Sequence, residues 1–247
     1  MAIARVELSG NINQRTARQI REVISYIGSS RKYGALILVV NSGGGDANSS
    51  ELLMGDIIKL RKKIPVFSVI MGTGASGAYW IASGSTKIYA MNTSILGSIG
   101  VIGIAPNVNQ LMNKLGIRIE VLKVGEYKDM LNPFTESSVA AREKYQAILE
   151  HSYTVFKNSI SQNRKLSSEI TERVSTGEIF SAPQALEFGL IDKIATEEDA
   201  VNDLVKAYGL KRKIREVSPR RSFVERVISS GIAFSFLTRM FRALEEI

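Results

Sequence analysis

Residues 65–80 read PVFSVIMGTGASGAYW, an apolar run that leads directly into a turn made of small residues. Five of the six residues 65–70 are apolar and three are β-branched, which predicts a buried strand. Residues 78–82 suit a helix, so we expect the chain to turn sharply at Ser76. The first N–H groups of such a helix lack partners within it and point at the turn. Ser76 is therefore a candidate nucleophile, with the Gly77 N–H as a donor to an oxyanion. Phosphate binding or simple tight packing is the alternative.

The composition limits the kinds of site that the chain can build. It has 247 residues, of which 45% are hydrophobic, with no cysteine and a single histidine, His151. This excludes disulfides, thiol nucleophiles and metal sites built from cysteines or several histidines, and we expect no metal and no cofactor. Most of the net charge of +8 lies in the last 37 residues, which carry nine Lys or Arg and four Glu. The positive charge therefore bears on the binding partners of the C-terminal tail more than on those of the core.

The first half of the chain alternates between strand and helix patterns. Strands are predicted at 3–8, 35–40 and 65–70, and amphipathic helices at 11–27 and 49–62. This order, with apolar strands, is typical of a mostly parallel sheet flanked by helices. Glycine-rich turns follow the second and third strands, at 43–45 and 72–77. Because the carboxyl ends of parallel strands lie at one edge of a sheet, we expect both turns to face one crevice.

The second half is predicted to contain further strands, helices and a tail. Short strands and turns are expected at 87–90 and 97–104 and a strand at 117–124, followed by helices at 136–163, 181–189 and 197–207. His151 falls on the long helix, off the centre of its apolar stripe, and we interpret it as a surface or packing residue. Residues 211–221 are interpreted as a linker and 222–244 as a basic amphipathic helix. We therefore divide the chain into a domain of residues 1–210 and a C-terminal extension of residues 211–247.

Five motifs lie in order within residues 3–195. They are NSGGG at 41–45, GASGAYW at 74–80, GSIGV at 97–101, GEYKD at 125–129 and FSAPQALEFGLID at 180–192. As a set they resemble the signal peptide peptidase A family, also called protease IV, which consists of serine proteases of the Clp/crotonase fold. The resemblance implies an α/β fold with a mostly parallel sheet and flanking helices, to which this chain adds the amphipathic C-terminal extension.

The resemblance also implies a catalytic dyad of serine and lysine. Ser76 matches the family's nucleophile and Lys128 its general base, while Ser98 matches a hydroxyl that holds the lysine amine in place. The backbone N–H groups of Gly45 and Gly77 match the oxyanion hole. The expected activity is that of a serine peptidase.

One position departs from the family pattern. The family commonly has Ser-Pro-Gly-Gly in the first glycine turn, and Gly43 stands here in the place of the proline. The turn therefore loses a constraint on φ. The position of the Gly45 N–H is the assignment that this change affects most.

The surroundings of Lys128 decide whether it can act as a base. A lysine amine loses its proton readily only where it is buried among apolar groups and away from carboxylates. Glu126 and Asp129 lie beside it in sequence, but in an extended segment Asp129 points away, because neighbouring side chains alternate. Clp-type proteases use a Ser-His-Asp triad instead. No histidine lies between Ser76 and His151, so Lys128 is the better candidate.

Substrates, partners and location follow from the resemblance alone. It implies apolar peptide substrates, such as cleaved signal peptides, and an S1 pocket for small or apolar side chains. It implies a ring- or dome-shaped homo-oligomer, in which serine and lysine can come from adjacent subunits, and a membrane-associated place at the extracytoplasmic face. The chain itself has no apolar run long enough to span a membrane and is interpreted as soluble or peripheral. The helix at 222–244 is a candidate for membrane contact, and we expect no nucleic-acid partner.

Three alternatives stay open. A stomatin-partner-type protease of the same fold has the same dyad and different substrates. A crotonase-like acyl-CoA enzyme uses the oxyanion hole of the fold without a nucleophilic serine, and Ser76 and Lys128 argue against it. An inactive scaffold would only bind apolar peptides, and the substitution Ser76→Ala would leave its behaviour unchanged.

Overall fold

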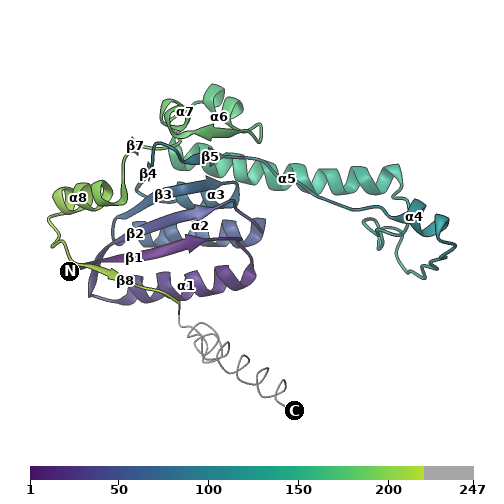
Figure 1. Cartoon of the computed structure of the whole chain (residues 1–247), viewed down its shortest axis with the longest axis horizontal. Coiled ribbons are helices and arrows are strands. Elements are labelled where there is room, and N and C mark those ends of the chain that lie inside the picture. The colour runs from purple at the N-terminus through teal and green to yellow at the C-terminus, as the bar shows by residue number, and fades with distance from the viewer. Residues whose placement is uncertain (220–247) are drawn as a thin grey trace, which may run out of the picture.

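Parallel strands form the centre of the fold in the computed structural model, which describes residues 1–219 (Figure 1). The sheet of this described part has eight strands, in the order β6-β5-β3-β2-β1-β8, while β4 pairs with β3 and β7. Their bounds are β1 Ala2–Ser9, β2 Tyr33–Ser42, β3 Val66–Ala75, β4 Lys87–Ala90, β5 Ile95–Gly97, β6 Ile179–Ser181, β7 Lys193–Ile194 and β8 Ile214–Glu216. All pairs are parallel except β5 with β6. The predicted α/β fold with a mostly parallel sheet is confirmed, whereas the predicted helix at 222–244 lies outside the described residues.

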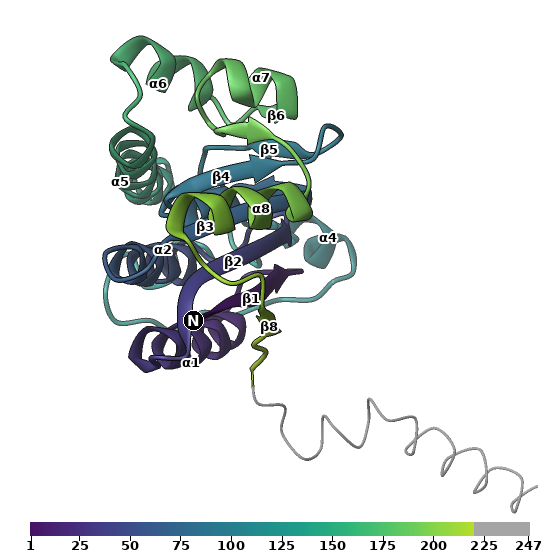
Figure 2. The same cartoon turned by 90° about the vertical axis from the view of Figure 1, so that its left-hand side faces the viewer.

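Helices cover both faces of this sheet (Figure 2). One face carries α1 Gln14–Ser29, α2 Ala47–Arg61, α3 Gly77–Ser83 and α5 Val139–Arg164, and the other carries α8 Glu197–Tyr208. The short helices α6 Ser168–Val174 and α7 Ala182–Glu187 lie beside β6. Strand β2 is buried on both sides, because Leu36 and Leu38 enter the larger core and Ile37 and Val39 enter the core under α8. None of the helices within residues 1–219 is both long and apolar enough to cross a membrane.

A long projection leaves the body of the protein between β5 and α5. We call residues 103–138 the arm; it contains α4 Asn109–Lys114 and lies at the far end of α5 in Figure 1. The predicted strand at 117–124 is wrong, because this stretch is irregular and pairs with no strand of the described chain. Within 97–104, where short strands and turns were predicted, only Gly97 belongs to a strand, because β5 ends there. An alternating pattern makes a strand only where a sheet edge is present to pair with it.

The segment predicted as a linker contributes one strand. Residues 214–216 form β8, which pairs in parallel with β1 at the edge of the sheet. Arg5 of β1 holds this edge through ion pairs with Glu197 of α8 and Glu216 of β8, at 2.7 and 3.8 Å. The sequence analysis missed this strand, because three residues with two charges carry no apolar pattern. The division into a domain and an extension stays a prediction.

Candidate active site

Ser76 occupies a sharp turn between β3 and α3. Its backbone has φ 52° and ψ −127°, a conformation that residues other than glycine rarely adopt. The Ser76 N–H donates to the Gly97 carbonyl at 2.8 Å, and the Ser76 carbonyl accepts from the Trp80 N–H at 3.0 Å. The hydroxyl, in contrast, makes no hydrogen bond with any described residue. A strained serine that is fixed through its backbone and free at its side chain is typical of a nucleophile turn.

The turn at 43–45 packs directly against the Ser76 turn. A Cβ atom built on Gly44, whose φ is +100°, would lie 2.7 Å from the Gly77 nitrogen, so only glycine allows this approach. A Cβ built on Gly77 would lie 3.5 Å from the Gly45 nitrogen. The N–H groups of Gly45 and Gly77 therefore lie close together. Neither donates to another group in the described part of the chain.

Flanking backbone bonds hold the 43–45 turn in place. The Ile12 N–H donates to the Gly44 carbonyl at 2.9 Å, and the Ile12 carbonyl accepts from the Asp46 N–H at 2.8 Å. Asp46 also caps α2, because its side chain accepts from the Ser49 N–H at 2.8 Å. Two unpartnered donors, one on this turn and one on the Ser76 turn packed against it, have the character of an oxyanion hole.

Ser98 lies in the same cleft as Ser76. It too has a positive φ, 51°, and its N–H donates to the Glu178 carbonyl at 2.6 Å. The cleft has a volume of about 790 Å³. Its lining combines both glycine turns with apolar side chains: Gly10, Asn11, Gly43, Gly44, Gly45, Asp46, Ala47, Ser76, Gly77, Trp80, Ser98, Gly100, Val101, Ile102, Phe156 and Gly177. The structure thus brings together four of the five predicted site residues.

The fifth residue, Lys128, lies elsewhere in the single chain. It is exposed, belongs to the arm between α4 and α5, and does not line the cleft of its own chain. The expected burial is therefore absent in one copy of the chain. Both neighbouring carboxylates have other partners: Asp129 forms an ion pair with Lys123, which lowers the pKa of the Asp129 carboxyl, and the Glu126 carboxylate raises the pKa of the Tyr127 hydroxyl beside it. The role of Lys128 as a base stays a prediction.

His151 lies on the exposed side of α5, in agreement with its interpretation as a surface residue. It does not line the cleft of Ser76. The structure therefore places no histidine beside the candidate nucleophile.

Two aromatic residues that line the cleft were not predicted from the sequence as site residues. Trp80 and Phe156 stack with ring centroids 4.4 Å apart and an interplanar angle of 21°, and both line the cleft. The spacing of four residues between Ser76 and Trp80 was a signal for one of them, because it places both on one face of a helix. Phe156 carried no such signal, since it looks like any core residue of an amphipathic helix.

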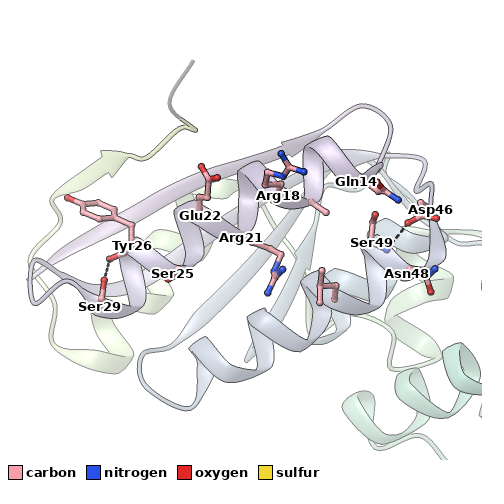
Figure 3. A pocket seen from close by; sticks show the side chains of 12 residues that line it. Gln14, Arg18, Arg21, Glu22, Ser25, Tyr26, Ser29, Asp46, Asn48 and Ser49 are labelled. Carbon is pink, nitrogen blue, oxygen red and sulfur yellow. Dashed lines mark hydrogen bonds between the residues drawn. The ribbon is translucent and has the colours of Figure 1, made fainter. Parts of the chain in front are cut away.

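A second hollow lies between α1 and α2 (Figure 3). Its volume is about 810 Å³, and Arg18, Arg21, Glu22 and Asp46 are among its lining residues. Arg21 already pairs with Asp56 at 2.6 Å, and Asp46 is used as the cap of α2, as the dashed line in Figure 3 shows. The hollow contains no counterpart of the Ser76 turn, so its size alone does not make it the better candidate.

Comparisons with known proteins point to one family. The sequence profile of Peptidase family S49 matches residues 58–211. A Synechocystis protein named as a protease is 35% identical over 80% of this chain and 71% of its own length. A Methanocaldococcus jannaschii protein named as a protease is 38% identical, over 68% of this chain and 54% of its own length. An Enterococcus faecium protein named as a signal peptide peptidase is 34% identical over 69% of this chain and 50% of its own length. The chain thus spans only about half the length of the last two relatives.

A solved structure shares the fold. A mutant of the membrane-bound stomatin-specific protease 1510-N superposes with a TM-score of 0.58, covering 89% of this chain and 98% of its own chain, at 17% sequence identity. At that identity the likeness bears on the fold alone.

Proposed function

The chain belongs to Peptidase family S49, and from this premise we propose that it is a serine endopeptidase that hydrolyses apolar peptides, such as cleaved signal peptides. Ser76 is the nucleophile and Lys128 is the general base. The observation that carries the proposal is the Ser76 turn, where a serine with a free hydroxyl and a strained backbone lies in one cleft with the unpartnered N–H groups of Gly45 and Gly77. The assignment of lysine rather than histidine rests on the family resemblance and on the exposed position of His151.

The reaction follows from these groups. The Ser76 oxygen attacks the carbonyl carbon of the scissile bond while its proton passes to the neutral amine of Lys128. The Gly45 and Gly77 N–H groups donate to the oxyanion of the tetrahedral intermediate. Collapse breaks the C–N bond, the lysine returns the proton to the leaving amine, and the acyl group stays on Ser76. Water then attacks the ester with Lys128 again as base, and Ser98 holds the lysine amine in place.

We propose that the lysine of each site comes from a second copy of the chain. Lys128 does not line the cleft of its own chain, and the arm that carries it projects away from the body. The arm also exposes apolar side chains almost completely, with Leu122 at 89% and Val124 at 97%. Large exposed apolar side chains mark a surface that another molecule covers. A neighbouring copy in a ring or dome would cover them and bring the arm to a cleft.

The proposed substrates agree with the lining of the cleft. Trp80, Phe156, Val101 and Ile102 supply apolar surface beside Ser76, and such surface favours apolar side chains. Substrates of this kind would be met at a membrane, where we propose that the protein works, at the extracytoplasmic face. The basic residues 222–244 are the segment proposed to contact the membrane. Equal partitioning onto anionic liposomes by the full chain and by a chain ending at Pro219 would discard that contact.

A covalent probe tests the nucleophile directly. A fluorophosphonate, which labels activated serines, is applied to the wild type, to Ser76→Ala and to Thr73→Ala, and the labelled residue is identified by mass spectrometry. We expect label on Ser76 in the wild type and in Thr73→Ala, and none in Ser76→Ala. Hydrolysis of a fluorogenic apolar peptide should follow the same order, with Ser76→Ala down by roughly 10³-fold or more. Full peptidase activity in Ser76→Ala would refute the proposal that Ser76 is the nucleophile. It would also reopen the acyl-CoA alternative, in which the site works without a nucleophilic serine.

A further inference from the structure

The amino ends of the parallel strands form a positively charged surface, which we call the basic edge and which consists of residues 31–32, 62–63, Lys87 and 211–213. We propose that the protein lies on an anionic lipid bilayer through the basic edge, with the cleft of Ser76 turned away from the lipid. The inference rests on the membrane location proposed above and assumes nothing about the peptidase reaction. It adds a contact of the folded body to the one proposed for residues 222–244, and it fixes an orientation.

The topology of the sheet gathers the basic edge from four separate segments. Strands β2, β3, β4 and β8 run parallel in one array with β1, so they all begin at the same edge of the sheet. The Ala2 N–H of β1 donates to the Lys32 carbonyl at 2.8 Å. The Ile3 N–H donates to the Lys213 carbonyl, also at 2.8 Å. In the sequence, residues 211–213 count toward the positive C-terminal tail, but these bonds place them on the body, on the side from which Figure 2 is viewed.

The charges of the basic edge have few partners. All of its Lys and Arg side chains are exposed. Asp and Glu are absent from the connections that lead into its four strands, which are residues 30–32, 62–65, 84–86 and 209–213. Within residues 1–219, Arg212 is the only member with an ion pair, to Glu198 at 2.7 Å. Asp203, which attracts Lys87, is already paired with Lys193 at 2.9 Å. A surface of like charge repels itself, so an anionic partner would relieve this repulsion.

The composition and the width of the basic edge favour a lipid surface. Lysine outnumbers arginine in it. Lysine binds phosphate as a point charge, whereas arginine supplies the bidentate geometry of a specific phosphate site. The basic edge extends across five adjacent strands, from β4 through β3, β2 and β1 to β8, which is about 19 Å at the usual spacing between strands. Charges spread this widely suit many mobile headgroups rather than one fixed phosphate.

Two tyrosines flank the basic edge. Tyr26 packs on Tyr33 at the start of β2, with ring centroids 6.1 Å apart. Tyr208 packs on Phe67 near the start of β3, with ring centroids 6.3 Å apart. The exposed fractions of Tyr26 and Tyr208 are 48% and 46%. Tyrosine is enriched at membrane–water interfaces, where its ring meets the apolar side and its hydroxyl stays hydrated. Lysines beside exposed tyrosines therefore match the headgroup region of a bilayer.

The same strands carry the cleft at their other ends. The turn at 43–45 follows β2, and Ser76 follows β3. Each of these two strands has 10 residues, so about 30 Å separate its two ends. A bilayer in contact with the basic edge therefore leaves the cleft in water, together with the arm, which projects away from the strands' amino ends (Figure 1).

An environment-sensitive dye tests this orientation in the full chain. Because the chain has no cysteine, Ser29→Cys and Gln14→Cys give single labelling sites at opposite ends of α1 (Figure 3), and both positions are exposed. Ser29 lies close to the basic edge in sequence, whereas Gln14 lines one hollow with Asp46, which also lines the cleft. Each labelled protein is mixed with vesicles of phosphatidylglycerol and phosphatidylcholine, or of phosphatidylcholine alone. The dye at residue 29 should shift to the blue with the anionic vesicles only, and the dye at residue 14 with neither.

Two triple variants test the charges. The first replaces one lysine in each of three segments of the basic edge: Lys32→Gln, Lys63→Gln and Lys213→Gln. The control removes the same charge from exposed positions elsewhere: Arg18→Gln, Lys114→Gln and Arg142→Gln. Each basic residue at an anionic surface contributes about fivefold in affinity, so the partition coefficient onto the anionic vesicles should fall by about a hundredfold in the first variant. In the control, whose charges stay away from the lipid, it should fall by less than about threefold.

The inference is overturned if the wild type does not bind the anionic vesicles, if both triple variants lose equal affinity, or if the two dyes respond alike. Binding through residues 222–244 alone would leave both dyes in water and would overturn it as well. So would a duplex oligonucleotide that displaces the wild type from the vesicles at equal phosphate concentration, because the basic edge would then favour nucleic acid. Hydrolysis of a soluble peptide is measured in the same proteins and should be unchanged in the first triple variant. Its absence from the wild type would refute the peptidase proposal and leave this inference standing.

Discussion

Ser76 and Ser98 line one cleft and share an uncommon backbone conformation, with φ values of 52° and 51°. Each is held there by its own N–H, which donates to Gly97 and to Glu178 respectively. Left-handed φ values cost a residue with a Cβ on the order of 1–3 kcal/mol. Two such costs on one cleft indicate that the chain keeps both hydroxyls in place at the expense of stability.

This relationship predicts that Ser98 can be replaced by glycine without loss of fold. Ser98→Gly removes the strain and the hydroxyl together, so its free energy of unfolding should equal or exceed that of the wild type. Its kcat should fall by roughly tenfold to a hundredfold, because in the proposed mechanism the Lys128 amine loses its orienting partner. Urea unfolding and peptide hydrolysis measure the two effects. A variant with full kcat would remove Ser98 from the mechanism.

The two neighbouring glycines of the first turn should respond in opposite ways to alanine. Gly43 has an ordinary φ and open space where a Cβ would lie, so Gly43→Ala should keep activity and gain about 0.4–1 kcal/mol of stability. Gly44→Ala would place a Cβ 2.9 Å from the Ala75 carbonyl oxygen at a φ of +100°, and should lose stability and activity. Thermal unfolding and hydrolysis by the two variants check this. Equal behaviour would contradict the packing of the two turns.

Lys123 should keep the Asp129 carboxylate from pairing with Lys128, the proposed general base. It forms an ion pair with Asp129, the residue that follows Lys128. Lys123→Met should lower kcat/KM at neutral pH, because the released carboxylate can then pair with Lys128 and keep its amine charged. Asp129→Asn alone should have little effect, and the double variant should recover activity. Such non-additivity is the signature of coupled residues. An additive loss in the double variant would mean that Lys123 acts in some other way.

From the hydrogen bonds of Asp203 we expect the stability of the fold to depend on pH in a specific way. Its carboxylate accepts from Lys193 at 2.9 Å and from Tyr89 at 3.1 Å. The Lys193 ammonium, with help from Tyr89, holds the pKa of this carboxyl below its ordinary value of 3.8. Because this pKa is lower in the folded state than in the unfolded chain, the carboxylate stabilises the fold at pH values above 3.8. That stabilisation is lost as the pH falls through the folded-state pKa.

Asp203→Asn should therefore unfold at a lower temperature than the wild type at neutral pH, and the difference should shrink once the pH falls below 3.8. Thermal unfolding across this range measures it. A difference that stays constant down to the acid end would show that the carboxylate charge does not matter.

The order of apolar and small residues along the chain predicted those parts of the fold that depend only on neighbouring residues in the sequence. The runs at 35–40 and 65–70 became central strands, since their residues are apolar on both faces. The turn at Ser76 was predictable because a strand pattern meets a helix pattern across small residues. Residues 117–124 failed for the opposite reason: their alternation is real, and the described chain offers them no partner strand.

The residues of the candidate site also divide into those that the sequence predicted and those that it did not. Ser76 and Gly77 were expected at one turn because a strand pattern meets a helix pattern there, whereas Gly45 and Ser98 were assigned through the family resemblance, and the structure places all four in one cleft. Phe156 could not, because its place in the cleft depends on how α5 packs on α3. The separation of Lys128 from Ser76 depends on the path of the arm, which no sequence pattern describes.

The central claim, a site shared between chains, is tested most directly by mixing two inactive variants. Ser76→Ala and Lys128→Ala are purified separately, unfolded, mixed in equal amounts and refolded, and their hydrolysis of an apolar peptide is compared with that of the wild type. In random assembly half of the clefts keep Ser76 and half of the arms keep Lys128, so about a quarter of the wild-type activity should return. Mixed assemblies that form, as mass spectrometry of differently tagged chains can verify, and yet stay inactive would contradict the account.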